Sequence, residues 1–212
     1  MRWFSFINSL TKLRTETIVT MKHLLILIIL CSIGLNSSFA QKPYDAYQGG
    51  IVFYLFQEGD PGYVAGEVHG LIAATEDQTT IEEWDEIEDG TVWGCYENEL
   101  SGADGTAIGT GAQNTLDILT GCSEAGIAAK LAADYEVTVD GATYDDWFLP
   151  SKNELDMLYQ NKDTIGGFDY NRYWSSTQHV YYLAWIQYFT DGFQILSSSK
   201  TSNSAVRSVR AF

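Results

Sequence analysis

The part of the chain that most restricts its possible fold is the C-terminal stretch that begins at Asp145. It contains four short segments that are apolar, aromatic or β-branched and are bounded by polar residues or glycine. Such segments are typical of β-strands. They cover residues 173–176, 183–189, 193–197 and 205–212. Asp191-Gly192 between two of them indicates a tight turn. We therefore expect a cluster of antiparallel strands at the end of the chain.

Two further strands are predicted much earlier. Residues 51–57 form an apolar and aromatic run that begins after Gly49-Gly50 and ends before a turn rich in glycine and proline. Residues 69–74 follow that turn and are also apolar. We expect the two runs to pair as a hairpin.

Helical patterns occupy the middle of the chain. Residues 114–135 have apolar positions at helical spacing, broken by two glycines, and predict two short helical pieces with Cys122 between them. A second helix is predicted from Lys152 to about Gln160, because Ser151 and Glu154 have the spacing of a capping box. Strands, then helices, then strands indicate an α+β fold rather than alternating β and α units.

Seven segments of the sequence resemble a known group of bacterial domains. They are residues 49–53, 69–74, 105–111, 145–151, 173–176, 184–187 and 206–212. The set is similar to domains of the DUF1566 type, related to the C-terminal domain of the Legionella collagen-like adhesin and to the Fibrobacter major paralogous domain. The resemblance implies a C-type lectin-like fold with two main helical segments, antiparallel strands from both ends of the chain brought together, and long loops that face a ligand.

The first 40 residues are typical of an export signal. Lys22-His23 precedes the apolar run 24–35, and small residues lead up to a cleavage site after Ala40. The run is shorter than the ~20 residues that a spanning helix needs, so no stable membrane span is expected. We expect residues 41–212 to be one exported domain that is secreted, periplasmic or displayed at the cell surface.

The charge of the exported part limits its partners. Residues 41–212 keep eight of the 12 basic residues and 27 of the 28 acidic ones, which gives a net charge of −19. Nucleic acids and anionic lipid surfaces are recognised through an excess of Lys and Arg. We therefore expect neither as a partner.

Two cysteines, Cys95 and Cys122, lie in the exported part. An oxidising compartment favours one disulfide between them. A reactive thiol pair is the weaker alternative, because Cys95 lies beside Trp93 and Gly94 rather than among cationic groups that would lower its pKa.

The aromatic residues divide into predicted core and predicted surface. Trp147, Trp174 and Trp185 lie inside strand-like motifs, where aromatic rings usually fill the core. The segment around residues 170–182 mixes tyrosines with amides and is too polar for a core, which is the composition of many binding surfaces. The candidate ligand-binding residues are Tyr170, Arg172, Gln178, His179, Tyr181, Tyr182, Asp191 and Gln194.

The sequence favours binding over catalysis. The exported part has His69 and His179 only, without the motifs of a serine hydrolase or a zinc protease. His69 is read as a strand-end residue. An enzyme related to the formylglycine-generating enzymes is the alternative, but those enzymes use a copper-binding cysteine pair near the terminal strands, and no cysteine follows Cys122.

Charged residues near the terminal strands have mainly structural interpretations. Asp145 and Asp146 are expected to cap the turn before Trp147, and Arg207 and Arg210 to form ion pairs. The acidic segment 75–90 does not have the spacing of a calcium loop, and the calcium-binding triplets of lectins do not occur. We expect no metal and no cofactor.

These features together predict an exported, non-catalytic binding or adhesion module for an extracellular glycan or a surface or matrix protein. A structural envelope protein is the third possibility after the enzyme.

Overall fold

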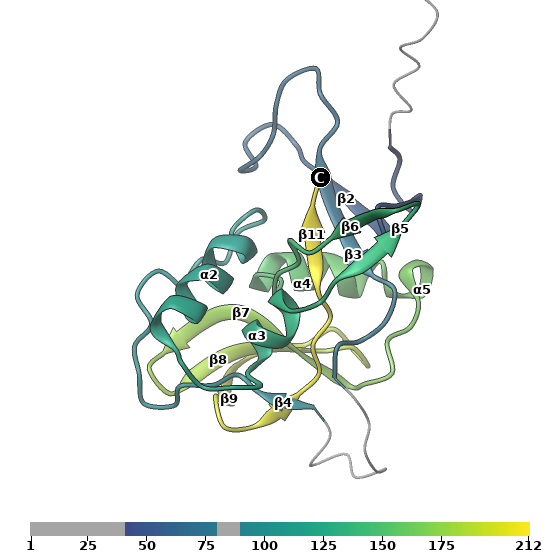
Figure 1. The fold of residues 1–212 in the computed structure, drawn as a ribbon. Coiled ribbons are helices and arrows are strands. Elements are labelled where there is room, and N and C mark those ends of the chain that lie inside the picture. The colour runs from purple at the N-terminus through teal and green to yellow at the C-terminus, as the bar shows by residue number, and fades with distance from the viewer. Residues whose placement is uncertain (1–40, 80–89) are drawn as a thin grey trace, which may run out of the picture. The chain divides into compact units, whose positions relative to one another are not determined.

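Strands from the two ends of the described chain share one antiparallel sheet. The computed structural model describes residues 41–79 and 90–212. The sheet has the order β1 (Ala46–Tyr47), β2 (Gly50–Leu55), β3 (Gly70–Ala74) and β11 (Val209–Ala211). Ala73 of β3 is paired with Ile51 on one side and with Val209 on the other. The predicted N-terminal hairpin is confirmed, and the C-terminus lies beside it (Figure 1).

The predicted C-terminal strands form a second antiparallel sheet. It contains β7 (Arg172–Val180), β8 (Leu183–Tyr188) and β9 (Gln194–Ser199). The predicted turn at Asp191-Gly192 joins β8 to β9: Gly192 has φ of +82°, and the Asp191 carboxylate accepts the N–H of Phe193 at 3.0 Å. The last predicted strand is interrupted. Its region contains β10 (Asn203–Ser204), which pairs with β4 (Thr91–Val92), and then β11.

Within the described residues, four short helices link the sheets. They are α2 (Gly111–Gly121), α3 (Ala128–Ala133), α4 (Lys152–Gln160) and α5 (Lys162–Ile165). The break between α2 and α3 contains Cys122, as predicted. The capping box of α4 is confirmed, since Ser151 and Glu154 each accept the other's backbone N–H through a side-chain oxygen. With these helices and antiparallel sheets, the α+β class is confirmed.

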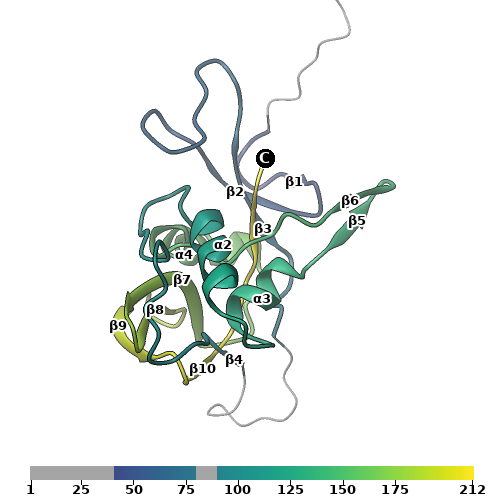
Figure 2. The same ribbon diagram turned by 60° about the vertical axis from the view of Figure 1, so that its left-hand side comes forward.

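One hairpin was not predicted. It consists of β5 (Val137–Val139) and β6 (Ala142–Tyr144), joined by two residues with positive φ, Asp140 at +53° and Gly141 at +82°. This is the Asp-Gly turn that favours two-residue hairpins. Figure 2 shows the hairpin extending away from α3, on the side opposite to β7, β8 and β9.

The core contains two of the three tryptophans predicted for it. Trp147 and Trp174 are buried, and each indole N–H donates to a backbone carbonyl. Trp185 differs, because it is only partly buried: the ammonium of Lys152 lies 4.4 Å from its ring centroid. The prediction of a core role for Trp185 was wrong, because β8 places it opposite Ala184 and Ile186, which face the core.

Both C-terminal arginines form ion pairs, as expected. The guanidinium of Arg207 is buried and binds Asp77 at 2.7 Å. Arg210 binds Asp146, so this carboxylate has an ion-pair partner in addition to any role in the turn. The predicted disulfide between Cys95 and Cys122 is present.

Two predictions fall on residues that the structure does not describe. The export signal, 1–40, lies outside the described residues, as does most of the acidic segment around Trp84. Among the described residues, no helix combines the length and the apolar character needed to cross a membrane.

Candidate functional site

Exposed tyrosines gather at one end of the three-stranded sheet. β7 and β8 are joined by two residues only, Tyr181 and Tyr182, which are 48% and 37% exposed. Their ring centroids are 4.6 Å apart in an edge-to-face arrangement. His179, which lies in β7 two residues before Tyr181, is exposed and contacts the Trp185 ring. We call the surface formed by His179, Tyr181, Tyr182 and, as described below, Tyr96 the tyrosine end.

A second turn lies against the first. The backbone N–H of Lys200, between β9 and β10, donates to the Tyr182 carbonyl at 3.1 Å. On either side of Lys200, the hydroxyls of Ser199 and Thr201 are 2.8 Å apart. The backbone of Tyr182 is therefore bonded to a turn that carries the hydroxyls of Ser199 and Thr201.

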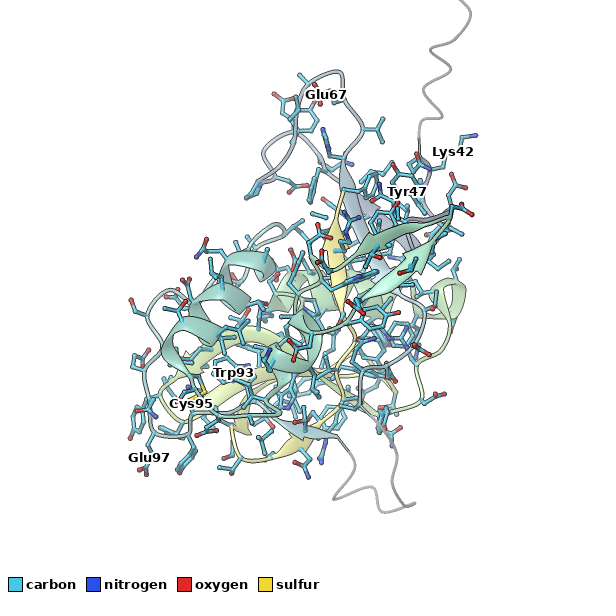
Figure 3. The ribbon with its side chains drawn as sticks, in the orientation of Figure 1. Lys42, Tyr47, Glu67, Trp93, Cys95 and Glu97 are labelled. Atoms are coloured by element: carbon cyan, nitrogen blue, oxygen red, sulfur yellow. A yellow bond between two sulfur atoms is a disulfide. The ribbon has the colours of Figure 1, made fainter. Side chains whose placement is uncertain are left out.

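A third segment, residues 93–99, completes this end. The backbone N–H of Trp93 donates to the Lys200 carbonyl at 3.0 Å, and Lys200 Nζ donates to the Asn98 carbonyl at 2.8 Å. Between these anchors lie Tyr96, which is 44% exposed, and Glu97. Figure 3 shows Trp93, Cys95 and Glu97 along this loop, with Glu97 on its outer side.

Lys200 and Gln178 form the buried support of the tyrosine end. Lys200 has no exposed surface, and its Nζ lies 2.7 Å from Gln178 Oε1 and 4.5 Å from the Trp93 ring centroid. Gln178 Oε1 also accepts the N–H of Leu100 at 3.0 Å, and its Nε2 donates to Glu99 at 2.7 Å. Burial lowers the pKa of the Lys200 amine to about 8, against an opposing effect of the Glu99 charge.

The structure separates the predicted ligand-binding residues into two groups. His179, Tyr181 and Tyr182 lie at the tyrosine end, and Gln178 lies beneath them but is only 3% exposed. The expectation that Gln178 contacts a ligand directly is not supported, because its amide is committed to Lys200, Leu100 and Glu99. Polarity alone did not reveal that these partners would bury it.

The other group lies at the opposite end of β7, roughly 25 Å away for a strand of nine residues. Arg172 begins β7, Asp191 belongs to the turn between β8 and β9, and Gln194 begins β9. The Gln194 amide donates to the Lys152 carbonyl at 2.8 Å. Tyr170 lines a shallow polar pocket of about 370 Å³ together with Lys162 and other residues of the 162–171 segment. One site built from both groups is therefore not possible.

A larger groove lies elsewhere, beside the unpredicted β5–β6 hairpin. It has a volume of about 510 Å³. Its lining includes Tyr47, Gln48, Val139, Asp140 and Tyr144. The alternating Val137–Tyr144 stretch around Asp140-Gly141 is the sequence signal that could have located one wall of this groove.

The one group of metal-type ligands in the described part of the chain is Cys95, Cys122 and Glu124. Its two sulfurs are joined as a disulfide, which removes the thiolates that bind metals. The Glu124 carboxylate instead accepts the N–H of Cys95 at 2.9 Å. This cluster has a structural role.

The chain matches no protein-family model, and a search of curated proteins finds no similar sequence.

Proposed function

We propose that this chain is an exported, non-catalytic module that binds an extracellular glycan or a surface or matrix protein through the tyrosine end. The observation that carries the proposal is the pair of exposed rings on the Tyr181-Tyr182 turn, held on a buried hydrogen-bonded base. Tyrosine provides a large contact area for a small loss of side-chain entropy, since it has two rotatable torsions. A preorganised turn lowers that loss further.

The chemistry around the rings suits a hydroxyl-rich or peptide ligand. An aromatic face packs against the apolar face of a sugar ring, while neighbouring polar groups bind its hydroxyls. Ser199, Thr201 and Glu97, on the two segments that join the Tyr181-Tyr182 turn at this end, supply such groups. The net charge of −19 for residues 41–212 disfavours polyanionic ligands.

The proposal includes a C-type lectin-like fold of the DUF1566 type. Three features support it: the C-terminal strand β11 returns to β3, two main helices α2 and α4 lie between the terminal strands, and long loops extend from the sheets. Export with cleavage after Ala40 belongs to the same proposal. Secreted material should then begin at Gln41 in an N-terminal mass measurement.

Two further observations favour binding over the enzyme alternative. Cys95 and Cys122 are bonded to each other, so they do not offer the thiol pair of the copper-dependent oxidases. His69 contacts Glu67 at 2.9 Å and the Phe212 carbonyl at 3.0 Å. These contacts fix the start of β3, as expected for a strand-end histidine.

The test is a binding screen with matched variants. The purified protein is applied to arrays of glycans and of matrix proteins, and each captured ligand is then tested with Tyr181→Ala/Tyr182→Ala. We expect at least a tenfold loss of affinity. Phe193→Ala is the control, because Phe193 is 64% exposed but lies at the opposite end of the same sheet.

Four outcomes would redirect or reject the proposal. Loss of binding with Phe193→Ala but not with the tyrosine variant would move the site to the far end of the sheet. Loss with Tyr144→Ala alone would move it to the groove beside β5–β6. Complete loss in EDTA would reveal a metal-dependent site. Turnover of a cysteine-containing peptide would show that the protein is an enzyme rather than a binding module, provided that replacing either cysteine in a folded variant abolishes the turnover.

A further inference from the structure

Lys200 is the most unusual charged residue of the described chain. Its side chain is fully buried, yet its hydrogen-bond acceptors are two neutral oxygens, the Asn98 carbonyl and Gln178 Oε1. A buried ammonium without a directly bonded carboxylate is costly. The amine is therefore driven toward its neutral form, in agreement with a pKa lowered by burial to about 8. A neutral lysine amine is a nucleophile.

The nearest electrophile is the side-chain amide of Gln178. Lys200 Nζ lies 2.7 Å from Oε1 of this amide. For ordinary hydrogen-bond geometry, the same nitrogen is then roughly 3.5 Å from the carbonyl carbon Cδ, which is the separation of a near-attack arrangement. The hydrogen bond places the nitrogen at the edge of the carbonyl, so the addition also requires the lysine side chain to rotate until the nitrogen lies over the carbonyl face.

Two neighbours are placed to assist this reaction. The backbone N–H of Leu100 donates to Gln178 Oε1 at 3.0 Å, at the atom where negative charge develops when an amine adds to the carbonyl. The Glu99 carboxylate lies 2.7 Å from Gln178 Nε2, the nitrogen that would leave. It can carry a proton to that nitrogen.

We propose that Lys200 and Gln178 join in a spontaneous intramolecular isopeptide bond. Lys200 Nζ adds to Cδ of Gln178 and forms the new N–C bond. Nζ loses one proton and Nε2 gains one, which the Glu99 carboxylate, hydrogen-bonded to Nε2, delivers. The Cδ–Nε2 bond then breaks and ammonia leaves. The step is an exchange of one amide for another, so it uses no oxidant, reductant or other co-reactant.

The bond would join the last part of β7 to the turn between β9 and β10. These are the two segments that support Tyr182 and Ser199 at the tyrosine end. A covalent link there would hold that end together under mechanical load or partial unfolding. The inference rests on the buried cluster alone and does not depend on which ligand the surface binds.

Trypsin provides a direct test, because Lys200 is itself a cleavage site. The full chain is incubated at pH 8 to 9, digested after reduction and alkylation, and examined by mass spectrometry. Without the bond, trypsin releases residues 173–200. With it, cleavage after Lys200 is blocked, and residues 173–207 appear as one peptide that is lighter than expected by one ammonia. Fragment ions should place the missing ammonia at Gln178 and the modified amine at Lys200.

Two variants serve as controls. Lys200→Arg keeps a positive charge and a trypsin site but has no nucleophilic amine, so residues 173–200 should be released. Glu99→Gln changes an exposed residue and should leave the fold intact. It should slow bond formation by about 100-fold or more, the usual effect of losing a proton carrier.

Two results would contradict the proposal or one part of it. Cleavage of folded wild-type protein after Lys200, with Gln178 unmodified after prolonged incubation, would overturn the proposal. Bond formation in Glu99→Gln at the wild-type rate would overturn the role of Glu99. A folded state should be verified by near-ultraviolet circular dichroism before each digest.

Discussion

The backbone N–H of Gly109 donates to Glu154 Oε1 at 2.7 Å, across 45 residues of sequence. The other carboxylate oxygen, Oε2, accepts the N–H of Ser151 at 2.7 Å within the capping box. One buried side chain thus fixes the start of α4 and the loop that leads into α2. The capping box was predicted from sequence, whereas its second role in holding Gly109 was not.

The packing around Glu154 predicts the effect of a single methyl group. A Cβ atom at Gly111 would lie 2.2 Å from Glu154 Oε2 and 2.8 Å from Ser151 N. We expect Gly111→Ala to destabilise the protein by about 1 to 3 kcal/mol, the usual cost of overpacking. Gly121→Ala in the same helix is the control, because its nearest neighbour is the flexible end of Leu100. Urea denaturation gives both values, and equal stabilities would contradict the packing.

Glu154 also predicts a dependence of stability on pH. Burial raises the pKa of its carboxyl to about 7, although the backbone N–H groups of Ser151, Gly109 and Gly111 act in the opposite direction. Because the folded pKa exceeds the ordinary value of 4.5, the folded state binds more protons between these pH values than the unfolded state. This contribution is present in full below pH 4.5 and is lost as the pH rises through about 7.

The size of the effect follows from the shift, at 1.36 kcal/mol per pH unit, and is about 3 kcal/mol. The comparison is between wild type and Glu154→Gln, which does not titrate. The variant should be less stable than wild type at pH 5, because its amide group faces backbone donors, and the difference should shrink by pH 8. A constant difference in free energy of unfolding across this range would show that Glu154 is ionised throughout.

The tryptophans and tyrosines should respond differently to truncation. Trp147→Ala and Trp174→Ala each remove a buried ring and its indole hydrogen bond, so we expect losses of roughly 3 to 5 kcal/mol. Tyr181→Ala and Tyr182→Ala remove partly exposed rings and should leave the melting temperature nearly unchanged while weakening ligand binding. Thermal denaturation of the four variants measures these losses. Larger losses for the tyrosine variants than for the tryptophan variants would mean that the tyrosines, rather than the tryptophans, belong to the core.

Local patterns predicted the elements of this fold better than they predicted the site. The capping box at Ser151, the turn at Asp191-Gly192 and the break at Cys122 depend on residues close in sequence, and all three are present. The burial of Gln178 depends on Glu99, Leu100 and Lys200, which come from distant segments. The polarity of Gln178 therefore predicted an exposed side chain. Only the fold shows that its hydrogen-bond partners are other residues of the protein rather than a ligand.

The same distinction applies to the two groups of candidate residues. Tyr181 and Asp191 are ten residues apart in the sequence and both belong to polar turns. Their separation in space follows from β8, which runs between them as an extended strand of six residues. A strand places its flanking turns at opposite ends of a sheet. The two turns have similar compositions, but the strand between them prevents them from forming one site.

The disulfide permits a last prediction that separates stability from binding. Cys95 and Cys122 are 27 residues apart, and closing a loop of this length stabilises a protein by about 3.5 kcal/mol in the chain-entropy model. We expect Cys95→Ser/Cys122→Ser to lose an amount of this order in urea denaturation. Thiol titration of the denatured, unreduced wild type should find neither of these two thiols free.

Binding should nevertheless survive in the folded fraction of that variant. Although Cys95 directly precedes Tyr96, the loop is also held by Trp93 and Asn98, both of which hydrogen-bond to Lys200. Titration with an array-identified ligand, corrected for the folded fraction, should therefore give a dissociation constant within a few fold of wild type. A loss of affinity as large as that of Tyr181→Ala/Tyr182→Ala would mean that the disulfide, rather than the hydrogen bonds to Lys200, sets the position of the tyrosine end.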